Sequence, residues 1–481
     1  MLNIDLYPLL TQLSASLGQR YETWRRKKII SFLSRVNPER LEHWGEKAIV
    51  RAFRNAANRV PYYRDLLRQV GINPSSIKSI KEWGELPLLD KSIFQKAEIA
   101  DLTIGGSLSN IKGILTSSGF SGKFSFGVNS KKNWQNTARM IDLVLDYALK
   151  IGSRKTLAIN CLPMGVKMFT NEMVLAEVSV REDMALALIE NFHKFFEQII
   201  IVGEAFFLKS LVEEGVRSGL DWKSLNVSLI VGEDSFPESY RTYMQALLGI
   251  SHDTYPMRRL IGSSLGVAEV DLCLFHETAD TIRIRRFADT NLDFRRTLFG
   301  DELTAVPMLF QFYPQRTFIE RDLGNHFSPT ILTTTTFSPG DIPLIRYQTG
   351  DTSLVIPYKK TEKILRSFGK EDLVPQLKLP LIAVKSRHAS TPGLTALADE
   401  VRDRIFRDPE IARRVTGYFK IRDNAEEKRI DLQLTKDVST PENVAILKKR
   451  FIITGISINP IAYYDFHDAL ILNYNKKFHH T

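Results

Sequence analysis

Short apolar runs alternate with helical patterns through the middle of the chain, and this alternation is the feature that most constrains the fold. Residues 156–162, 198–203 and 227–233 are rich in Ile, Val and Leu, as strands buried on both faces are. Residues 133–150 and 206–220 carry apolar side chains at helical spacing. Strands that alternate with helices predict an α/β domain with mostly parallel sheets, which place ligand sites at the carboxyl ends of their strands.

The pattern changes after about residue 380. Apolar side chains between residues 394 and 405 share one helical face, and residues 417–422 and 429–436 then alternate with period two across a turn, as a β-hairpin does. Thr440-Pro441 is typical of a helix start, and a strand-like stretch follows. We therefore expect a small α+β domain of residues 385–481 behind a large domain of residues 1–384, since 481 residues exceed one ordinary core.

The first seventy residues or so are predicted to be helical. Residues 41–60 form the clearest segment, and Pro61 is expected to end it. Its predicted apolar face consists of Trp44, Ala48, Ile49, Phe53 and Ala56.

Composition describes an ordinary globular protein, with 43% hydrophobic and 25% charged residues. No apolar run approaches the ~20 residues of a membrane-spanning helix, and the first residues lack the basic segment of a secretory signal. We therefore expect a cytoplasmic protein with no transmembrane segment. The two cysteines, Cys161 and Cys273, lack metal-type spacing, so neither a zinc site nor a disulfide framework is expected.

The charge balance favours an acidic partner, because 65 Lys and Arg against 55 Asp and Glu give a net charge of +10. A nucleotide, an acidic carrier protein or an anionic membrane fits this charge, whereas no aromatic-basic module supports nucleic acid. A basic surface without a specific partner is the alternative. The densest basic run, Trp-Arg-Arg-Lys-Lys at residues 24–28, lies on a stretch of helical spacing and is compatible with a helix in a membrane interface.

Residues 114–127, ILTSSGFSGKFSFG, form either an anion-binding loop or a flexible turn. Glycine N–H groups, serine hydroxyls and one lysine can all bind a phosphate. A Walker loop is excluded, since it needs four residues before its Gly-Lys pair and only Phe120 and Ser121 intervene here. The candidate anion ligands are Ser117, Ser118, Gly119, Ser121, Gly122 and Lys123.

Three further stretches follow this loop in a fixed order: LIVGEDSFPESYR at 229–241, RRLIGSSLGVAEV at 258–270 and IPLIRYQTGDTSLV at 342–355. This ordered set resembles the adenylate-forming superfamily of acyl-CoA synthetases, and most closely its phenylacetate-CoA ligase branch. PYYRDLL at 61–67 and LPLLDKSIF at 86–94 resemble amino-terminal stretches of the same branch. The RYQTGD segment is the most specific part of the resemblance.

The resemblance implies a large amino-terminal domain, a small mobile carboxyl-terminal domain and ATP-dependent ligase chemistry. A carboxylate would attack the α-phosphate of ATP with Mg2+ present, pyrophosphate would leave, and the acyl group would pass to a thiol, either of CoA or of a carrier protein. The serine-glycine loop would wrap the β- and γ-phosphates.

The same resemblance assigns site residues. Asp351 would bind the ribose, Gly232 and Glu233 would lie beside the adenine, and Gly262 and Ser264 would belong to the nucleotide site. Arg387, in a hinge-like segment, could pair with nucleotide oxygens. Lys477, near the end of the chain, would be a catalytic lysine that enters the active site during adenylation, with Lys476 as the neighbouring choice. Lys123 of the serine-glycine loop would be the other catalytic lysine.

Some positions depart from the family pattern around the phosphates and the metal. Leu265 stands where a metal-binding glutamate is expected, and leucine offers no oxygen ligand. Glu269 could replace it, or it could be a surface residue. Phe120, Phe124 and Gln348 also replace residues common in the family. The chain is then either an active divergent ligase or a binding or scaffold protein with weakened chemistry, and retention of Lys123, Asp351, Arg387 and a terminal lysine favours activity.

The substrates are less constrained. Met164, Met168, Phe169 and Phe236 are candidate linings of an acid pocket, which would prefer an apolar or aromatic carboxylic acid. An acidic acyl carrier protein would suit the basic surface, CoA is the alternative thiol, and an amine acceptor would make the protein an amide-forming ligase. A homodimer is the commonest assembly for such a chain.

Overall fold

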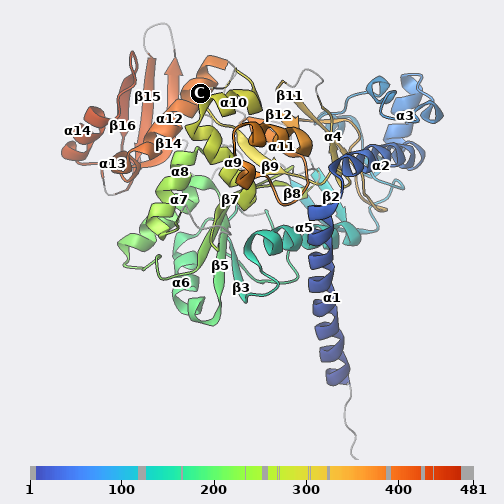
Figure 1. The fold of residues 1–481 in the computed structure, drawn as a ribbon, viewed down its shortest axis with the longest axis horizontal. Helices are drawn as coiled ribbons and strands as arrows, with labels where there is room; N and C mark the ends of the chain where they lie inside the picture. The colour runs from blue at the N-terminus through green and yellow to red at the C-terminus, as the bar shows by residue number, and fades with distance from the viewer. Residues whose placement is uncertain are drawn as a thin grey trace, which may run out of the picture.

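The structure is a computed structural model that describes residues 7–116, 126–163, 166–232, 235–251, 258–267, 269, 271–301, 303, 305–321, 326–385, 392–423, 428–436 and 438–466. Figure 1 shows three parts: a large body of sheet and helices, a smaller unit at the carboxyl-terminal end, and one long helix, α1, which extends away from the body.

The large body is organised around a sheet in the order β10-β11-β12-β13-β9-β8-β7-β6-β5-β3-β4. A two-stranded sheet, β1 with β2, lies apart from it. The bounds of these strands are β1 Ile111–Thr116, β2 Phe126–Ser130, β3 Thr156–Asn160, β4 Val174–Glu177, β5 Gln198–Gly203, β6 Val227–Gly232, β7 Ile261–Val267, β8 Asp271–His276, β9 Met308–Gln311, β10 Thr317–Ile319, β11 Ser328–Thr334, β12 Tyr347–Ile356 and β13 Leu381–Lys385.

The large sheet is mixed. Strands β7, β6, β5, β3 and β4 pair in parallel, whereas β8 and the strands on its far side pair antiparallel. The α/β class predicted from the sequence is confirmed, but the parallel arrangement is confined to this half. The sequence runs that predicted parallel strands are β3, β5 and β6, and all three lie in it. In the antiparallel half, β12 carries polar residues in its first part, whereas β9 and β13 are short buried runs.

The parallel half is covered on both faces. Ile199 and Ile201 of β5 belong to an apolar cluster with helices α6 to α8, whereas Ile200 and Val202 belong to a second cluster with α5 and α9. Successive side chains of a strand point to opposite faces, so an unbroken apolar run requires two covering layers. The covering helices are α5 Lys131–Leu149, α6 Glu182–Phe192, α7 Ala205–Arg217, α8 Glu238–Leu248 and α9 Ala279–Thr290, and α10 Leu292–Phe299 and α11 Tyr358–Ser367 pack beside the antiparallel half.

The amino-terminal helices are α1 Tyr7–Arg35, α2 Pro38–Arg59 and α3 Pro61–Gln69. Helix α2 confirms the predicted segment and begins three residues earlier, with Asn37 as its N-cap. Ala48, Ile49, Phe53 and Ala56 are buried as predicted, but Trp44 is 41% exposed, so its place on the buried face was wrong. The α2 core instead continues through Leu41 and Gly45, which passes close to Pro314 where a tryptophan would not fit.

Short helical elements complete the connections: η1 Pro74–Ser76, η2 Trp83–Glu85, α4 Ile93–Lys96, η3 Ala100–Leu102, η4 His193–Phe195 and η5 Glu371–Leu373. None of the helices among the described residues is both long and apolar enough to cross a membrane.

The carboxyl-terminal unit contains helices around a three-stranded sheet, as the sequence pattern predicts. The predicted hairpin is the antiparallel pair β14-β15, and the last predicted strand, β16, adds in parallel to β15. Thr440 caps the predicted helix by accepting a hydrogen bond from the N–H of Asn443. The elements are α12 Pro392–Arg407, α13 Pro409–Ala412, β14 Val415–Asp423, β15 Lys428–Leu434, α14 Pro441–Arg450 and β16 Ser457–Ile461.

This unit packs against helices α7 and α8 of the body. Phe206 meets Tyr418 at 4.7 Å between ring centroids, and Tyr240 meets Phe406 at 5.0 Å. The buried Lys209 donates from Nζ to the carbonyl oxygen of Val415 at 2.9 Å. The carboxyl-terminal unit therefore contacts the body through aromatic packing and through a hydrogen bond from a buried lysine.

Candidate active site

The parallel strands β6 and β7 bring predicted site residues together at their carboxyl ends. Gly232, the last residue of β6, stands in register with Ser264 of β7, and Gly262 stands in register with Ile230. A Cβ at Gly232 would lie 3.1 Å from Leu162, which is tighter than nearly all real Cβ contacts. Glycine at this position therefore leaves room for the Leu162 side chain at the carboxyl end of β6, where doubly wound sheets place their ligands.

Strand β12 carries RYQTGD and has an irregularity at its most specific residues. The register with β11 shifts between Pro329 and Ile331, opposite residues 349–351. Gly350 adopts a φ of +87°, a conformation that L side chains rarely reach. Bulges of this kind change the direction of a side chain within a strand.

A local hydrogen-bond pair holds the aspartate of this segment. The Thr349 hydroxyl donates to Oδ2 of Asp351 at 2.9 Å and accepts from the Asp351 N–H at 3.1 Å. Asp351 is half-buried, which leaves part of its surface open. An aspartate held in this way is preorganised to accept hydrogen bonds from a diol.

The arginine that opens the same segment has a structural function. Arg346 has a φ of +51° and pairs with Glu320 through Nε at 2.8 Å and Nη2 at 2.9 Å. Its Nη1 donates to the carbonyl oxygen of Gly84 at 3.0 Å. Leu89 pairs with the backbone beside Arg346 and Tyr347, so the 86–94 and 342–355 stretches picked out in the sequence are neighbours in space.

Glu269 is buried, so the alternative that it is a surface residue is wrong. Its side chain is 2% exposed, and its Oε1 accepts a hydrogen bond from the Tyr347 hydroxyl at 2.9 Å. Lys91 Nζ lies 3.7 Å from the same oxygen. Glu269, two residues after the end of β7, is thus hydrogen-bonded directly to Tyr347, the first residue of β12. Leu265, at the family position of the metal ligand, is half-buried in β7.

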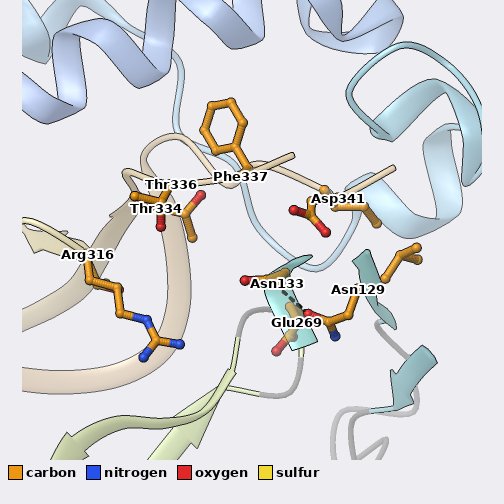
Figure 2. A pocket seen from close by; sticks show the side chains of 11 residues that line it. Asn129, Asn133, Glu269, Arg316, Thr334, Thr336, Phe337 and Asp341 are labelled. Carbon is orange, nitrogen blue, oxygen red and sulfur yellow. Dashed lines mark hydrogen bonds between the residues drawn. The ribbon is translucent and has the colours of Figure 1, made fainter. Parts of the chain in front are cut away.

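Glu269 also lines a small polar cavity of about 30 Å3, shown in Figure 2. Such a volume holds roughly two water molecules. Burial lowers the pKa of Arg316, another lining residue, to about 10. The other lining residues are Val128, Asn129, Asn133, Thr317, Thr334, Thr336, Phe337, Asp341 and Ile342.

The second carboxylate of this cavity is fixed by backbone groups. Asp341 Oδ1 accepts the N–H of Ser130 and Oδ2 accepts the N–H of Ser338, each at 2.6 Å. Burial raises the pKa of Asp341, although these two hydrogen bonds counteract it. Ser130 is also the N-cap of α5, so Asp341 ties the start of α5 to the loop before β12.

The donor set can be compared with what Mg2+ requires. Magnesium is usually held by one or two carboxylates, with substrate phosphates and water completing six oxygen ligands. Among the described residues there is no group of three or more metal-type side chains. The cavity holds two buried carboxylates, Glu269 and Asp341, and both oxygens of Asp341 already accept backbone N–H groups. This donor set fits an ion held chiefly by phosphate oxygens and does not fit an all-protein cage.

A buried ionic cluster supports the segment after β6. Arg241 of α8 and Arg285 of α9 both bind Glu238, and Arg285 Nη2 also donates to the carbonyl oxygen of Phe236 at 2.6 Å. Burial alone would raise the pKa of Glu238, but the two arginines together with Arg286 lower it to about 2. The segment that leaves β6 is thereby held by charge-assisted hydrogen bonds.

This cluster changes the interpretation of Phe236 as a lining of the acid pocket. Its ring lies 4.9 Å from the guanidinium carbon of Arg241 and 5.6 Å from that of Arg285. Met168 and Phe169 lie in the other apolar cluster, where Phe169 packs on Trp134 with ring centroids 4.1 Å apart. Phe236 is therefore separate from the two residues with which the sequence grouped it.

Several predicted residues lie outside the described part of the chain. Their roles stay predictions, and they are Ser117, Ser118, Gly119, Ser121, Gly122, Lys123, Met164, Glu233, Arg387, Lys476 and Lys477. Among the described residues, sequence reasoning missed Lys91 and Arg316. Lys91 stood in the quoted LPLLDK stretch, which offered a signal, whereas Arg316 has no motif around it.

Comparison with known proteins shows which solved structures share this fold. No protein-family model matches the chain, and no curated protein resembles it in sequence. Among solved structures, 2-hydroxyisobutyryl-CoA ligase in the postadenylation state, in complex with R3-HIB-AMP, matches with a TM-score of 0.61 at 12% identity over 89% of this chain and 87% of that chain. The same ligase in complex with 2-HIB-AMP and CoA in the thioesterification state matches with a TM-score of 0.54 at 12% identity, over 89% and 88% of the two chains.

The chain therefore has the fold of the adenylate-forming acyl-CoA ligases. The resemblance inferred from RYQTGD and its companion stretches is confirmed at the level of this superfamily fold. Membership of the phenylacetate-CoA ligase branch stays a prediction.

Proposed function

We propose that the protein activates a carboxylic acid with ATP to an acyl-adenylate, releases pyrophosphate and transfers the acyl group to a thiol. The observation that carries this proposal is the β12 bulge, which presents Asp351 in a fold shared with ligases solved as AMP-adduct complexes. A scaffold protein would have no need of a positive-φ glycine beside a half-buried, preorganised aspartate. We further propose that the enzyme is of the phenylacetate-CoA ligase type.

The residues of this chain act by positioning and by charge. Asp351 accepts hydrogen bonds from the two ribose hydroxyls, and the strand ends at Gly232, Ser264 and the following Glu233 lie beside the adenine. The loop at 117–123 surrounds the β- and γ-phosphates, with Lys123 supplying charge. Lys477 and Arg387 approach from the carboxyl-terminal unit. These assignments follow the family pattern residue by residue.

The first chemical step needs no acid-base pair, because the attacking carboxylate already carries its charge. One of its oxygens bonds to the α-phosphorus, the bond to the pyrophosphate oxygen breaks, and the electron pair leaves with pyrophosphate. Glu269 is the residue that would help to hold Mg2+, which supplies charge neutralisation on the phosphate oxygens when bound. Lys91 and the Tyr347 hydroxyl keep the Glu269 carboxylate in place.

The second step replaces the adenylate by a thioester. A thiolate attacks the acyl carbonyl carbon, and the bond to the AMP oxygen breaks so that AMP leaves with the electron pair. CoA is the acceptor that the fold neighbours favour, and a carrier protein or an amine remains the alternative acceptor. The apolar cluster around Met168, Phe169 and Trp134 favours an apolar or aromatic acid.

The experiment that tests the function is acid-dependent exchange of labelled pyrophosphate into ATP across aryl, short-chain and long-chain acids. Each of the ribose hydrogen bonds to a carboxylate contributes about 1.5–3 kcal/mol, so Asp351→Asn should raise the KM for ATP roughly tenfold to a hundredfold. Asp372→Asn is the matched control. Asp372 is an exposed aspartate outside RYQTGD, and its carboxylate pairs with Arg283. Failure of every acid class to support exchange, despite ATP binding, would favour the scaffold alternative.

A further inference from the structure

The densest basic run of the chain is divided between the interior and the surface. Arg26 is buried and donates from Nε to Asp146 at 3.1 Å and from Nη1 to Glu172 at 3.0 Å. These two ion pairs fasten α1 to the body. Trp24, Lys27 and Lys28 remain exposed. Arg26 of this run therefore anchors the helix, whereas Trp24, Lys27 and Lys28 face solvent.

One exposed face of α1 combines aromatic and basic side chains. Tyr21, Trp24, Lys28, Phe32 and Arg35 follow one another at spacings of three or four residues, which places them on one side of a helix. Tyr21, Trp24 and Phe32 are 57%, 54% and 46% exposed. This stripe spans roughly 21 Å along the helix axis.

Helix α2 continues the same face. Phe32 of α1 stacks on Trp44 of α2 with ring centroids 6.1 Å apart. Arg40, Trp44, Lys47 and Arg51 are exposed at helical spacing on α2. We call these nine residues of the two helices the aromatic-basic face. It contains no acidic residue.

The acidic side chains nearest to this face in the sequence pair with other basic groups. Glu46 lies 3.6 Å from the exposed His43. Glu22 pairs with Arg25 and Arg139, Glu39 pairs with Lys359, and Glu42 pairs with Arg321. The face itself carries five basic side chains, those of Lys28, Arg35, Arg40, Lys47 and Arg51, beside exposed aromatic rings.

We propose that the aromatic-basic face docks on an anionic lipid surface. Tryptophan and tyrosine favour the headgroup region of a bilayer, and lysine and arginine are attracted to anionic lipids there. Figure 1 shows α1 projecting from the body. The proposal does not depend on the catalytic one.

The experiment is flotation of the full chain with phosphatidylcholine vesicles that contain or lack phosphatidylglycerol. We expect binding only to the anionic vesicles, and weaker binding as salt rises. Each basic residue at such a surface contributes about 1 kcal/mol, so Lys28→Gln with Lys47→Gln should weaken binding roughly thirtyfold. The matched control is Lys448→Gln with Lys449→Gln, which removes the same charge from exposed positions of α14.

A second variant pair tests the aromatic contribution. Trp24→Ser with Trp44→Ser should weaken binding, whereas Phe192→Ser with Phe195→Ser, exposed at another place, should not. Thermal unfolding confirms that each variant is folded. Absence of anionic-lipid-dependent flotation, or equal loss in the control pairs, overturns the proposal. Binding to double-stranded DNA without flotation overturns it as well, and so does a dimer that the tryptophan pair disrupts while vesicles bind no protein.

Discussion

The Tyr347 hydroxyl donates to Oε1 of Glu269 at 2.9 Å and joins the start of β12 to the end of β7. Both groups are buried, and Lys91 is the nearby cation at 3.7 Å. Glu269 is the candidate replacement for the metal ligand that is missing at Leu265, and Tyr347 lies within RYQTGD, so this bond connects two parts of the candidate nucleotide site. Its loss should affect both stability and catalysis.

Tyr347→Phe should lower the free energy of unfolding by about 1.5–3 kcal/mol, because a hydrogen bond to a buried carboxylate is lost. Urea unfolding measures this change. Tyr358→Phe is the matched control, since the Tyr358 hydroxyl donates to a neutral carbonyl, that of Pro375, at 3.2 Å. Its cost should be about 1 kcal/mol. An equal cost for the two variants would contradict a charged partner for Tyr347.

Glu269→Gln should raise the Mg2+ concentration required for half-maximal pyrophosphate exchange by about tenfold to a hundredfold, because the amide is a weaker ligand than the carboxylate. The measurement is a Mg2+ titration at fixed ATP and acid. Glu320→Gln is the control, since Glu320 is an equally engaged carboxylate that binds Arg346 and Trp83. A Glu269 variant with unchanged Mg2+ dependence but lower stability would assign Glu269 a purely structural role.

The secondary structure around the site was predictable where burial or a local capping signal determines it. The runs at 156–162, 198–203 and 227–233 are buried on both faces, and this burial requires the unbroken apolar composition that identified them as strands. The carboxyl-terminal unit was predictable for a similar reason, since the Thr440 cap and the hairpin alternation are local signals. Trp44 was misplaced because helical spacing shows which residues share a face but not which of two neighbouring stripes is covered.

The side chains of the site were less predictable because they depend on contacts between distant segments. The burial of Glu269 depends on Tyr347 and Lys91, which are 78 and 178 residues away along the chain. The position of Asp351 depends on a bulge whose partner strand, β11, shows no motif. Arg346 stood in the most specific stretch, yet its partners Glu320 and Gly84 carry no sequence signal.

Gly350→Ala should affect ATP binding more than stability. The φ of +87° costs a residue with a Cβ about 1–2 kcal/mol, and no atom lies within 4 Å of the added methyl group. Gly369→Ala is the matched control, with a φ of +64° and equally open surroundings at the end of α11. Both variants should lose similar stability in urea unfolding, but only Gly350→Ala should raise the KM for ATP, because Asp351 follows it. A similar KM in both would separate the bulge from nucleotide binding.

His276 gives a pH dependence that can be isolated. It is buried in β8 and its ring stacks on Tyr313 at 5.5 Å, and burial lowers its pKa from 6.5 to about 3. Between these two values the unfolded chain binds a proton that the folded chain does not, so the free energy of unfolding falls as the pH falls. The contribution is about 1.4 kcal/mol per pH unit. It is absent at pH values above 6.5, where the histidine is neutral in both states.

His276→Phe keeps the stacked ring and removes the titrating group, so this variant should lose less stability than the wild type on acidification. The difference between their unfolding free energies should change by about 1.2 kcal/mol from about pH 6 to about pH 5, because the unfolded histidine is not yet fully protonated at pH 6. Parallel pH profiles for wild type and His276→Phe would show that the histidine is protonated in the folded protein as readily as in the unfolded one, and that its burial is not maintained in solution.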